Sequence, residues 1–121
     1  MREPELLVDG LDHPEGVCWD PGAGALWAGG EAGQLYLVDV EARTYEQVAR
    51  APGFVLGLAV DGRGRVAVFC SGAGSLCVLE DGAVRTLRSG FTLPNYGAFA
   101  PDGTLYFSDS GSWTQDDGRV H

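Results

Sequence analysis

Two oxygen-bearing side chains could act as ligands of a cation. Glu15 and Asn95 each follow a proline, and each comes just before a short apolar stretch that contains a glycine. Carboxylate and amide oxygens are the donors that Ca²⁺ and Mg²⁺ prefer in proteins. Taken singly, an acid at such a position is usually solvated, and an asparagine after proline usually forms a turn. A metal site therefore depends on elements that bring the two residues together.

A repeat in the sequence predicts those elements. Gly16, Gly57 and Gly97 recur about every forty residues, each inside an apolar stretch that a turn and a second apolar stretch follow. In the first two copies, two further stretches come next. These further stretches are 34–38, 44–48, 75–79 and 83–87. Four short strands in about forty residues are typical of one blade of a β-propeller.

The predicted fold class is therefore all-β. We expect a β-propeller fragment of about three four-stranded blades, which is half of a six-bladed propeller. The blades cover approximately residues 12–50, 51–90 and 91–121, and the last one is incomplete. Residues 6–8 form an apolar stretch before the first blade and are expected to be a lone outer strand. Blades bury their faces only against neighbours, so the open blade edges are expected to allow self-association.

The overall charge excludes one class of partner. Seventeen acids against eight basic residues give a net charge of −9, which is the wrong sign for neutralising a phosphate backbone. No apolar run approaches the ~18 residues that a membrane helix needs, and the first residues lack the basic-then-apolar order of a signal peptide. We therefore expect a cytoplasmic protein that binds neither nucleic acid nor a membrane.

Few side chains are suited to nucleophilic catalysis. The sequence has no lysine, which excludes Schiff-base chemistry, and its histidines, His13 and His121, are poor members of a Ser-His-acid triad. Three cysteines, Cys18, Cys70 and Cys77, are an odd number without a metal-type pair. Reduced, partly buried thiols are the expectation, although Cys70 and Cys77 can lie on adjacent strands. The catalytic residues stay unassigned.

Two segments carry a resemblance to a known family. Residues 13–16, His-Pro-Glu-Gly, and residues 94–109, which begin Pro-Asn-Tyr-Gly, resemble the N-terminal half of the regucalcin/gluconolactonase family. The resemblance implies a six-bladed propeller about twice as long as this chain, with a divalent metal at the mouth of the central tunnel. It implies that Glu15 is a metal ligand, and that Asn95 is a ligand or contacts the metal's water and substrate. Ca²⁺ is the expected metal, and Zn²⁺, Mn²⁺ or Mg²⁺ could substitute.

The sequence also departs from this family. A second asparagine and an aspartate that later blades supply in relatives have no counterpart here. Leu93 and Tyr96 stand where many relatives have arginine and aspartate, so any substrate contact of Tyr96 differs from theirs. Asp109 is expected to accept hydrogen bonds from the loop after it rather than to line a pocket. Trp113, in that loop, is expected to be partly covered, with a pocket wall as the alternative.

Two functions from different classes follow. The leading hypothesis is a metal-dependent hydrolase of the sugar-lactonase type, an incomplete copy that needs a missing half or a second subunit. Its cation would polarise a lactone carbonyl and stabilise the developing oxyanion. The alternative is an inactive half-propeller that serves as a binding or assembly module, or a truncated gene product. A binding-only propeller of the NHL type is a third interpretation, and only the Glu15 and Asn95 pair argues against it.

Overall fold

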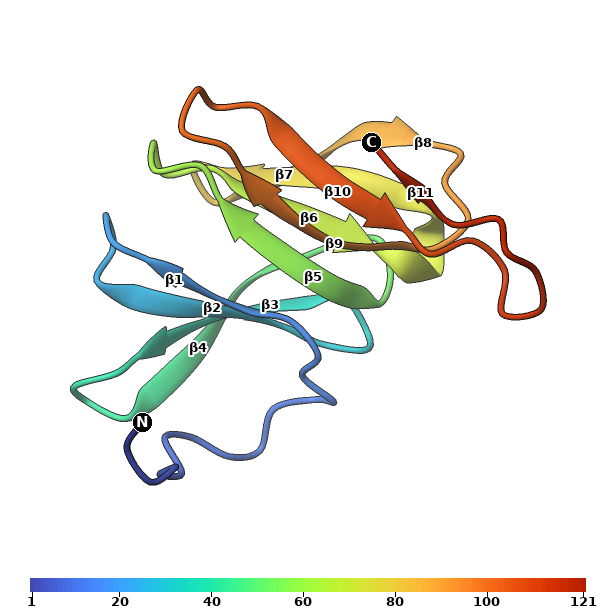
Figure 1. Ribbon diagram of the computed structural model, residues 1–121. Coiled ribbons are helices and arrows are strands. Elements are labelled where there is room, and N and C mark those ends of the chain that lie inside the picture. The colour runs from blue at the N-terminus through green and yellow to red at the C-terminus, as the bar shows by residue number, and fades with distance from the viewer.

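The computed structural model describes residues 1–121, and its regular secondary structure is almost entirely antiparallel β-sheet (Figure 1). Three sheets follow one another along the chain, and we call them blades 1, 2 and 3. Blade 1 comprises β1 (Val17–Asp20), β2 (Ala25–Gly29), β3 (Gln34–Asp39) and β4 (Thr44–Arg50). Blade 2 comprises β5 (Val55–Val60), β6 (Val66–Cys70), β7 (Ser75–Glu80) and β8 (Ala83–Ser89), with the short 3₁₀ turn η1 (Ser71–Ala73) between β6 and β7.

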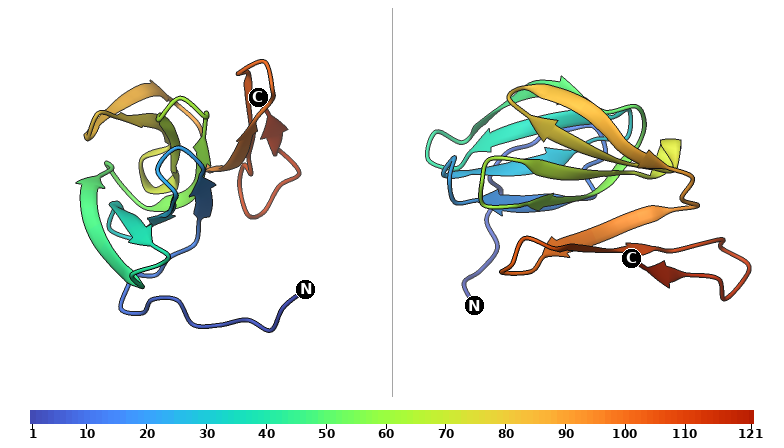
Figure 2. Two further views of the ribbon diagram at one scale, coloured as in Figure 1. Left: turned by 90° about the vertical axis from the view of Figure 1, so that its left-hand side faces the viewer. Right: turned by 90° about the horizontal axis from the view of Figure 1, so that it is seen from above.

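Blade 3 comprises β9 (Pro94–Phe99), β10 (Leu105–Asp109) and the two-residue strand β11 (Arg119–Val120). The strands are joined in simple succession in every blade, so each sheet is a meander. Figure 2 shows blade 3 as a layer beside blade 2. The predicted all-β architecture of successive propeller blades is thus confirmed. No helix in the structure has the length and apolar character to cross a membrane.

One expected strand is absent. Residues 6–8 lie in an irregular segment before β1, and this segment follows the edge of blade 1. The Arg43 guanidinium contacts the Glu5 carboxylate at 2.9 Å and donates to the Leu6 carbonyl at 3.3 Å, while the Tyr45 hydroxyl donates to the Gly10 carbonyl. The expectation of a lone outer strand was wrong, because side-chain contacts rather than a strand ladder hold the segment.

Two apolar clusters join the blades. The first lies between blades 1 and 2 and includes Leu35, Leu58 and Val68. The second lies between blades 2 and 3, where Phe69 of β6 is fully buried and packs on Phe107 of β10 with ring centroids 5.5 Å apart. Blade 2 therefore contributes a buried face to each side, whereas blades 1 and 3 each bury one face against it.

The repeated glycines explain how closely the first strands of the blades approach. A methyl group added at Gly16 would meet the Leu56 carbonyl oxygen at 2.5 Å, and one added at Gly57 would overlap the Asn95 carbonyl oxygen. Only glycine allows backbones to approach this closely. The three inner strands β1, β5 and β9 are therefore packed in matching register.

The aspartates that follow the inner strands have structural roles. Asp20 accepts hydrogen bonds from the Gly22 and Ala23 amides and from the Trp27 indole N–H. Asp61 and Asp102 likewise accept from backbone amides of the turns that they begin. These turns form what we call the far end of the blades, opposite the entry end at which β1, β5 and β9 begin. The acids of these turns close hairpins.

Candidate functional site

Glu15 lies at the entry end of blade 1, immediately before β1, and its side chain is about half exposed. The imidazole of His13 lies between two carboxylates, with Nε2 3.3 Å from Glu15 Oε1 and Nδ1 3.7 Å from Glu31 Oε2. Glu31 belongs to the turn between β2 and β3, which reaches the entry end because β2 runs back along β1. Glu15 thus stands in a small group of titratable side chains rather than alone.

Hydrogen bonds hold this part of the chain against blade 1. Asp12 Oδ2 accepts from the Gln34 side-chain amide at 2.8 Å and from the Ala32 backbone amide at 3.2 Å. The backbone amide of Glu31 donates to the Asp12 carbonyl at 3.1 Å. The Gln34 Oε1 atom is buried without a hydrogen-bond partner. The segment that carries His13 and Glu15 is therefore fixed to the β2–β3 turn.

Asn95 lies within β9, one residue after the strand begins, and not before the strand as expected. Its pairing with β10 is irregular there, because the register shifts between Phe107 and Asp109 and leaves an extra residue in β9. Such a bulge re-aims side chains. The Asn95 amide nitrogen donates to Ser110 Oγ at 2.9 Å, whereas its Oδ1 accepts no hydrogen bond within the chain. The oxygen that a cation would use is therefore uncommitted.

Tyr96 provides a direct link between blades 3 and 1. Its hydroxyl donates to the Val17 carbonyl at 3.1 Å, so the side chain crosses the start of β5 and reaches the strand that follows Glu15. Counted from the repeated glycines, Tyr96 occupies the position equivalent to Glu15. The structure thus brings Tyr96 to the strand next to Glu15, whereas Glu15 and Asn95 form no hydrogen bond with each other.

The donor set is small. No group of three or more histidine, cysteine, aspartate or glutamate side chains is placed to hold a metal ion. Glu15 and Asn95 offer a carboxylate and an amide oxygen, which are donors of the type that suits a hard cation, but Ca²⁺ takes six to eight oxygen ligands. Most ligands of any cation bound here would have to be water or groups from elsewhere.

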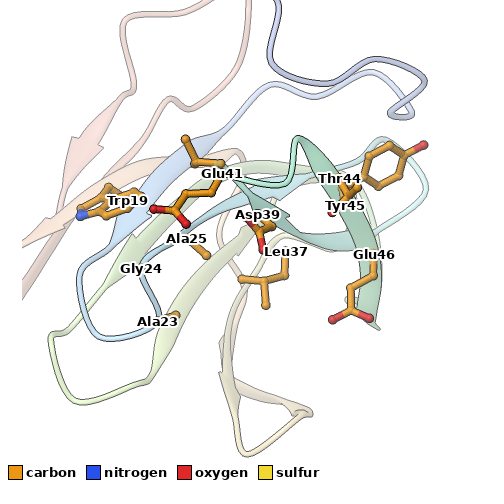
Figure 3. Close-up of a pocket in the computed structure, with 11 residues that line it drawn as sticks. Trp19, Ala23, Gly24, Ala25, Leu37, Asp39, Glu41, Thr44, Tyr45 and Glu46 are labelled. Atoms are coloured by element: carbon orange, nitrogen blue, oxygen red, sulfur yellow. The ribbon is translucent and has the colours of Figure 1, made fainter.

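One hollow lies at the far end of blade 1, between the β1–β2 turn and the β3–β4 turn (Figure 3). It has a volume of about 740 Å³ and is lined by Trp19, Tyr45 and the acids Asp39, Glu41 and Glu46, among others. Two of its polar side chains already form hydrogen bonds within the chain. Asp39 accepts one from the Ala42 amide, and the Tyr45 hydroxyl donates one to the Gly10 carbonyl. A smaller apolar hollow of about 250 Å³ borders Glu15, beneath Leu7, Val8 and Leu11.

Asp109 is a structural carboxylate. It is almost completely buried and accepts hydrogen bonds from the backbone amides of Leu93 at 2.7 Å, Thr92 at 3.0 Å and Gly111 at 3.2 Å. Burial alone would raise the pKa of Asp109, but these donors and the nearby His121 outweigh it and lower the pKa. The bond from Gly111 confirms the expected role toward the following loop. Trp113 in that loop is 92% exposed, so it is not partly covered as expected.

Sequence reasoning missed Glu31 and Ser110 as neighbours of the candidate ligands. Both lie in loops that connect outer strands at the entry end, between β2 and β3 and after β10. The order of strands in a blade could have indicated these neighbours. In an antiparallel meander, the turn after the second strand lies at the end of the sheet where the inner strand begins. Ligand candidates could therefore have been sought in those turns.

Comparisons with known proteins place the fold. No protein-family model matches the sequence, and a search of curated proteins finds no match. A gluconolactonase from Xanthomonas campestris superposes with a TM-score of 0.75 at 24% identity, over 85% of this chain and 37% of that one. A chain of the nidogen/laminin complex gives a TM-score of 0.78 at 17% identity, over 90% of this chain and 43% of that one.

Virginiamycin B lyase from Staphylococcus aureus gives a TM-score of 0.68 at 17% identity, over 89% of this chain and 40% of that one. The chain therefore spans less than half the length of each of these solved structures. Their descriptions differ in function, which accords with the use of one fold for many purposes. The likenesses establish that this chain has the β-propeller fold.

Proposed function

We propose that this chain supplies part of the cation and substrate site of a metal-dependent hydrolase that acts on sugar lactones. The observation that carries the proposal is the register of the inner strands, in which Gly16 packs on β5 and Gly57 packs on Asn95 and Tyr96. This register supports the proposal because Asn95 and Tyr96 of β9 lie across β5 from the start of β1, which Glu15 precedes. The solved gluconolactonase structures share the fold and add support for this choice of substrate class.

The residues of this chain would bind and orient rather than transfer protons. Glu15 and the uncommitted Oδ1 of Asn95 would hold the cation. Two hard oxygen donors favour Ca²⁺ over Zn²⁺, and Mg²⁺ or Mn²⁺ could substitute for Ca²⁺. A bound cation would supply polarisation of the lactone carbonyl and stabilise its developing negative charge. Tyr96 would border the substrate. Because two protein donors leave a cation site incomplete, we propose that activity also requires residues from a second subunit or from further blades.

Calcium titration by calorimetry tests the proposal. The wild-type chain is expected to bind Ca²⁺ weakly, in the high micromolar range or above, because two protein donors leave most of the coordination sphere to water. Glu15→Gln should abolish the binding heat. Glu46→Gln, which removes an exposed acid at the far-end hollow, should leave it unchanged. Tight binding that persists in Glu15→Gln would contradict the site.

A second candidate function, an assembly module, is favoured by the exposed apolar side chains of the outer blades. Val17 and Trp19 of blade 1 are each 52% exposed, and Tyr106 and Val120 of blade 3 are 54% and 79% exposed. In a ring of blades such faces pack against further blades. Two copies of a three-bladed half, related by a two-fold axis, could cover them.

Light-scattering mass across a concentration series tests this assembly. The wild-type chain is expected to form a dimer. Tyr106→Asp is expected to shift the mass toward that of the monomer, because it places a charge in the contact between the two copies. Leu87→Asp provides the control, since Leu87 is similarly exposed but lies on the outer strand β8. A monomer at every concentration would exclude the assembly function.

A further inference from the structure

Two thiols lie in contact inside blade 2. Cys70 ends β6, Cys77 lies in β7, and their sulfur atoms are 3.4 Å apart. Cys70 is paired across the ladder with Ser75, and Cys77 is paired with Val68, so the two cysteines are diagonal neighbours on adjacent strands. Both are fully buried. A disulfide requires about 2.05 Å between its sulfurs, so the two atoms would have to approach by roughly 1.4 Å. Because diagonal neighbours have Cα atoms farther apart than directly paired residues, β6 and β7 would shift slightly as the bond closes.

The surroundings make the two thiols unequal. The Cys70 thiol donates toward Cys77, whose sulfur also lies 3.6 Å from Thr86 Oγ1 and 3.9 Å from Ser75 Oγ. The hydrogen bond from Cys70 lowers the pKa of Cys77 and raises that of Cys70 itself. By contrast, burial, with the charge of Asp20 as a smaller cause, raises the pKa of Cys18 to about 12. Thiolate character is therefore concentrated on Cys77, with Cys70 in contact as its partner.

The pair lies beneath a part of the sheet that can open locally. Cys77 faces β8, the outermost strand of blade 2, and the ladder is irregular at this point. Leu76 pairs with Arg88 and Cys77 pairs with Thr86, which leaves Leu87 without a partner as a bulge. Edge strands with exposed, interrupted ladders open at low free energy. Local opening at this bulge would give a small solute access to Cys77.

We infer that Cys70 and Cys77 form a redox-responsive dithiol that a small hydroperoxide converts into a disulfide between β6 and β7. The Cys77 thiolate attacks one oxygen of hydrogen peroxide, which breaks the O–O bond, gives a sulfenic acid and releases hydroxide, which takes up a proton to become water. The Cys70 sulfur then attacks the Cys77 sulfur, the S–O bond breaks, and the Cys70 proton leaves with the hydroxyl group as water. In total two thiols and one hydrogen peroxide give one disulfide and two waters, with two electrons passing to the peroxide.

The test counts thiols in the 121-residue chain. The folded protein is treated with hydrogen peroxide, quenched with catalase, denatured and alkylated, and its mass is then measured. Before alkylation the oxidised chain is expected to be about 2 Da lighter, the mass of the two hydrogens lost in forming a disulfide. After alkylation it should carry a label only on Cys18, whereas the untreated chain carries labels on all three cysteines. Dithiothreitol should restore three labels.

Two variants separate this dithiol from general oxidation. Cys18→Ser should keep the 2 Da loss, because Cys18 takes no part. Cys70→Ser should not show it and should instead accumulate oxygen on Cys77, since no partner thiol remains to displace the hydroxyl group. Three labels on the treated wild-type chain, a disulfide that includes Cys18, or sulfinic acid on wild-type Cys77 would each overturn the inference.

Discussion

Gly57→Ala is expected to be among the most destabilising single substitutions in this chain, lowering its free energy of unfolding by about 3 kcal/mol. The added methyl group would overlap the Asn95 carbonyl oxygen and meet Tyr96 Cα at 3.0 Å. Both are backbone atoms of β9, so the clash cannot be relieved by turning a side chain. The inner strands of blades 2 and 3 would have to separate.

Urea unfolding followed by tryptophan fluorescence measures the effect. Gly118→Ala is a matched control, since the same methyl group there would meet its nearest atom, the Ser110 carbonyl oxygen, at an ordinary 3.4 Å. Its unfolding midpoint should stay within experimental error of wild type. A wild-type midpoint for Gly57→Ala would show that the inner strands are not packed in this register.

Asp109→Asn is expected to cost about 3 kcal/mol of folding free energy. The carboxylate accepts three backbone N–H groups, from Thr92, Leu93 and Gly111, and it is 4% exposed. An asparagine of the same shape has one acceptor oxygen and directs an N–H₂ group at the remaining donors. At least one of these three N–H groups would then lose its partner and face an N–H₂ group instead.

The same carboxylate predicts a dependence on pH. Because the native state holds the pKa of Asp109 below its ordinary value, its ionised form adds stability above about pH 4, the usual range of the unfolded group. That stability is lost as the pH falls through the lowered native pKa. The difference in urea midpoint between wild type and Asp109→Asn should therefore be full at pH 7 and shrink in acid. Asp116→Asn, at an exposed position, should match wild type throughout. A difference that does not change with pH would contradict the assignment.

The fold could be predicted because its strongest signal is local and repeated. Gly16, Gly57 and Gly97 mark the same point of three inner strands, and each is followed by turn residues that fix a hairpin. The backbones approach so closely at this point that only glycine fits. The glycine residues themselves therefore indicate where the inner strands pack together. The order of the remaining strands then follows from short connections.

The N-terminal segment and the candidate site could not be predicted as well. The apolar residues 6–8 satisfy a strand pattern, but a strand forms only where a partner ladder exists, and here the segment is held by Arg43 and Tyr45 instead. The contacts of His13 with Glu15 and Glu31 join residues on either side of a hairpin, and the sequence alone gives no such distance. The bulge that places Asn95 inside β9 is likewise a property of strand pairing.

The hydrogen bond from Tyr96 to Val17 has a consequence for how the molecule unfolds. In a linear array of repeats each unit senses only its immediate neighbours, so terminal units can fray independently. This bond joins residues 79 positions apart and connects the first blade to the third without passing through the second. Loss of blade 3 would therefore release a contact of blade 1 as well. Such coupling between non-adjacent repeats favours a single cooperative transition over stepwise melting from either terminus.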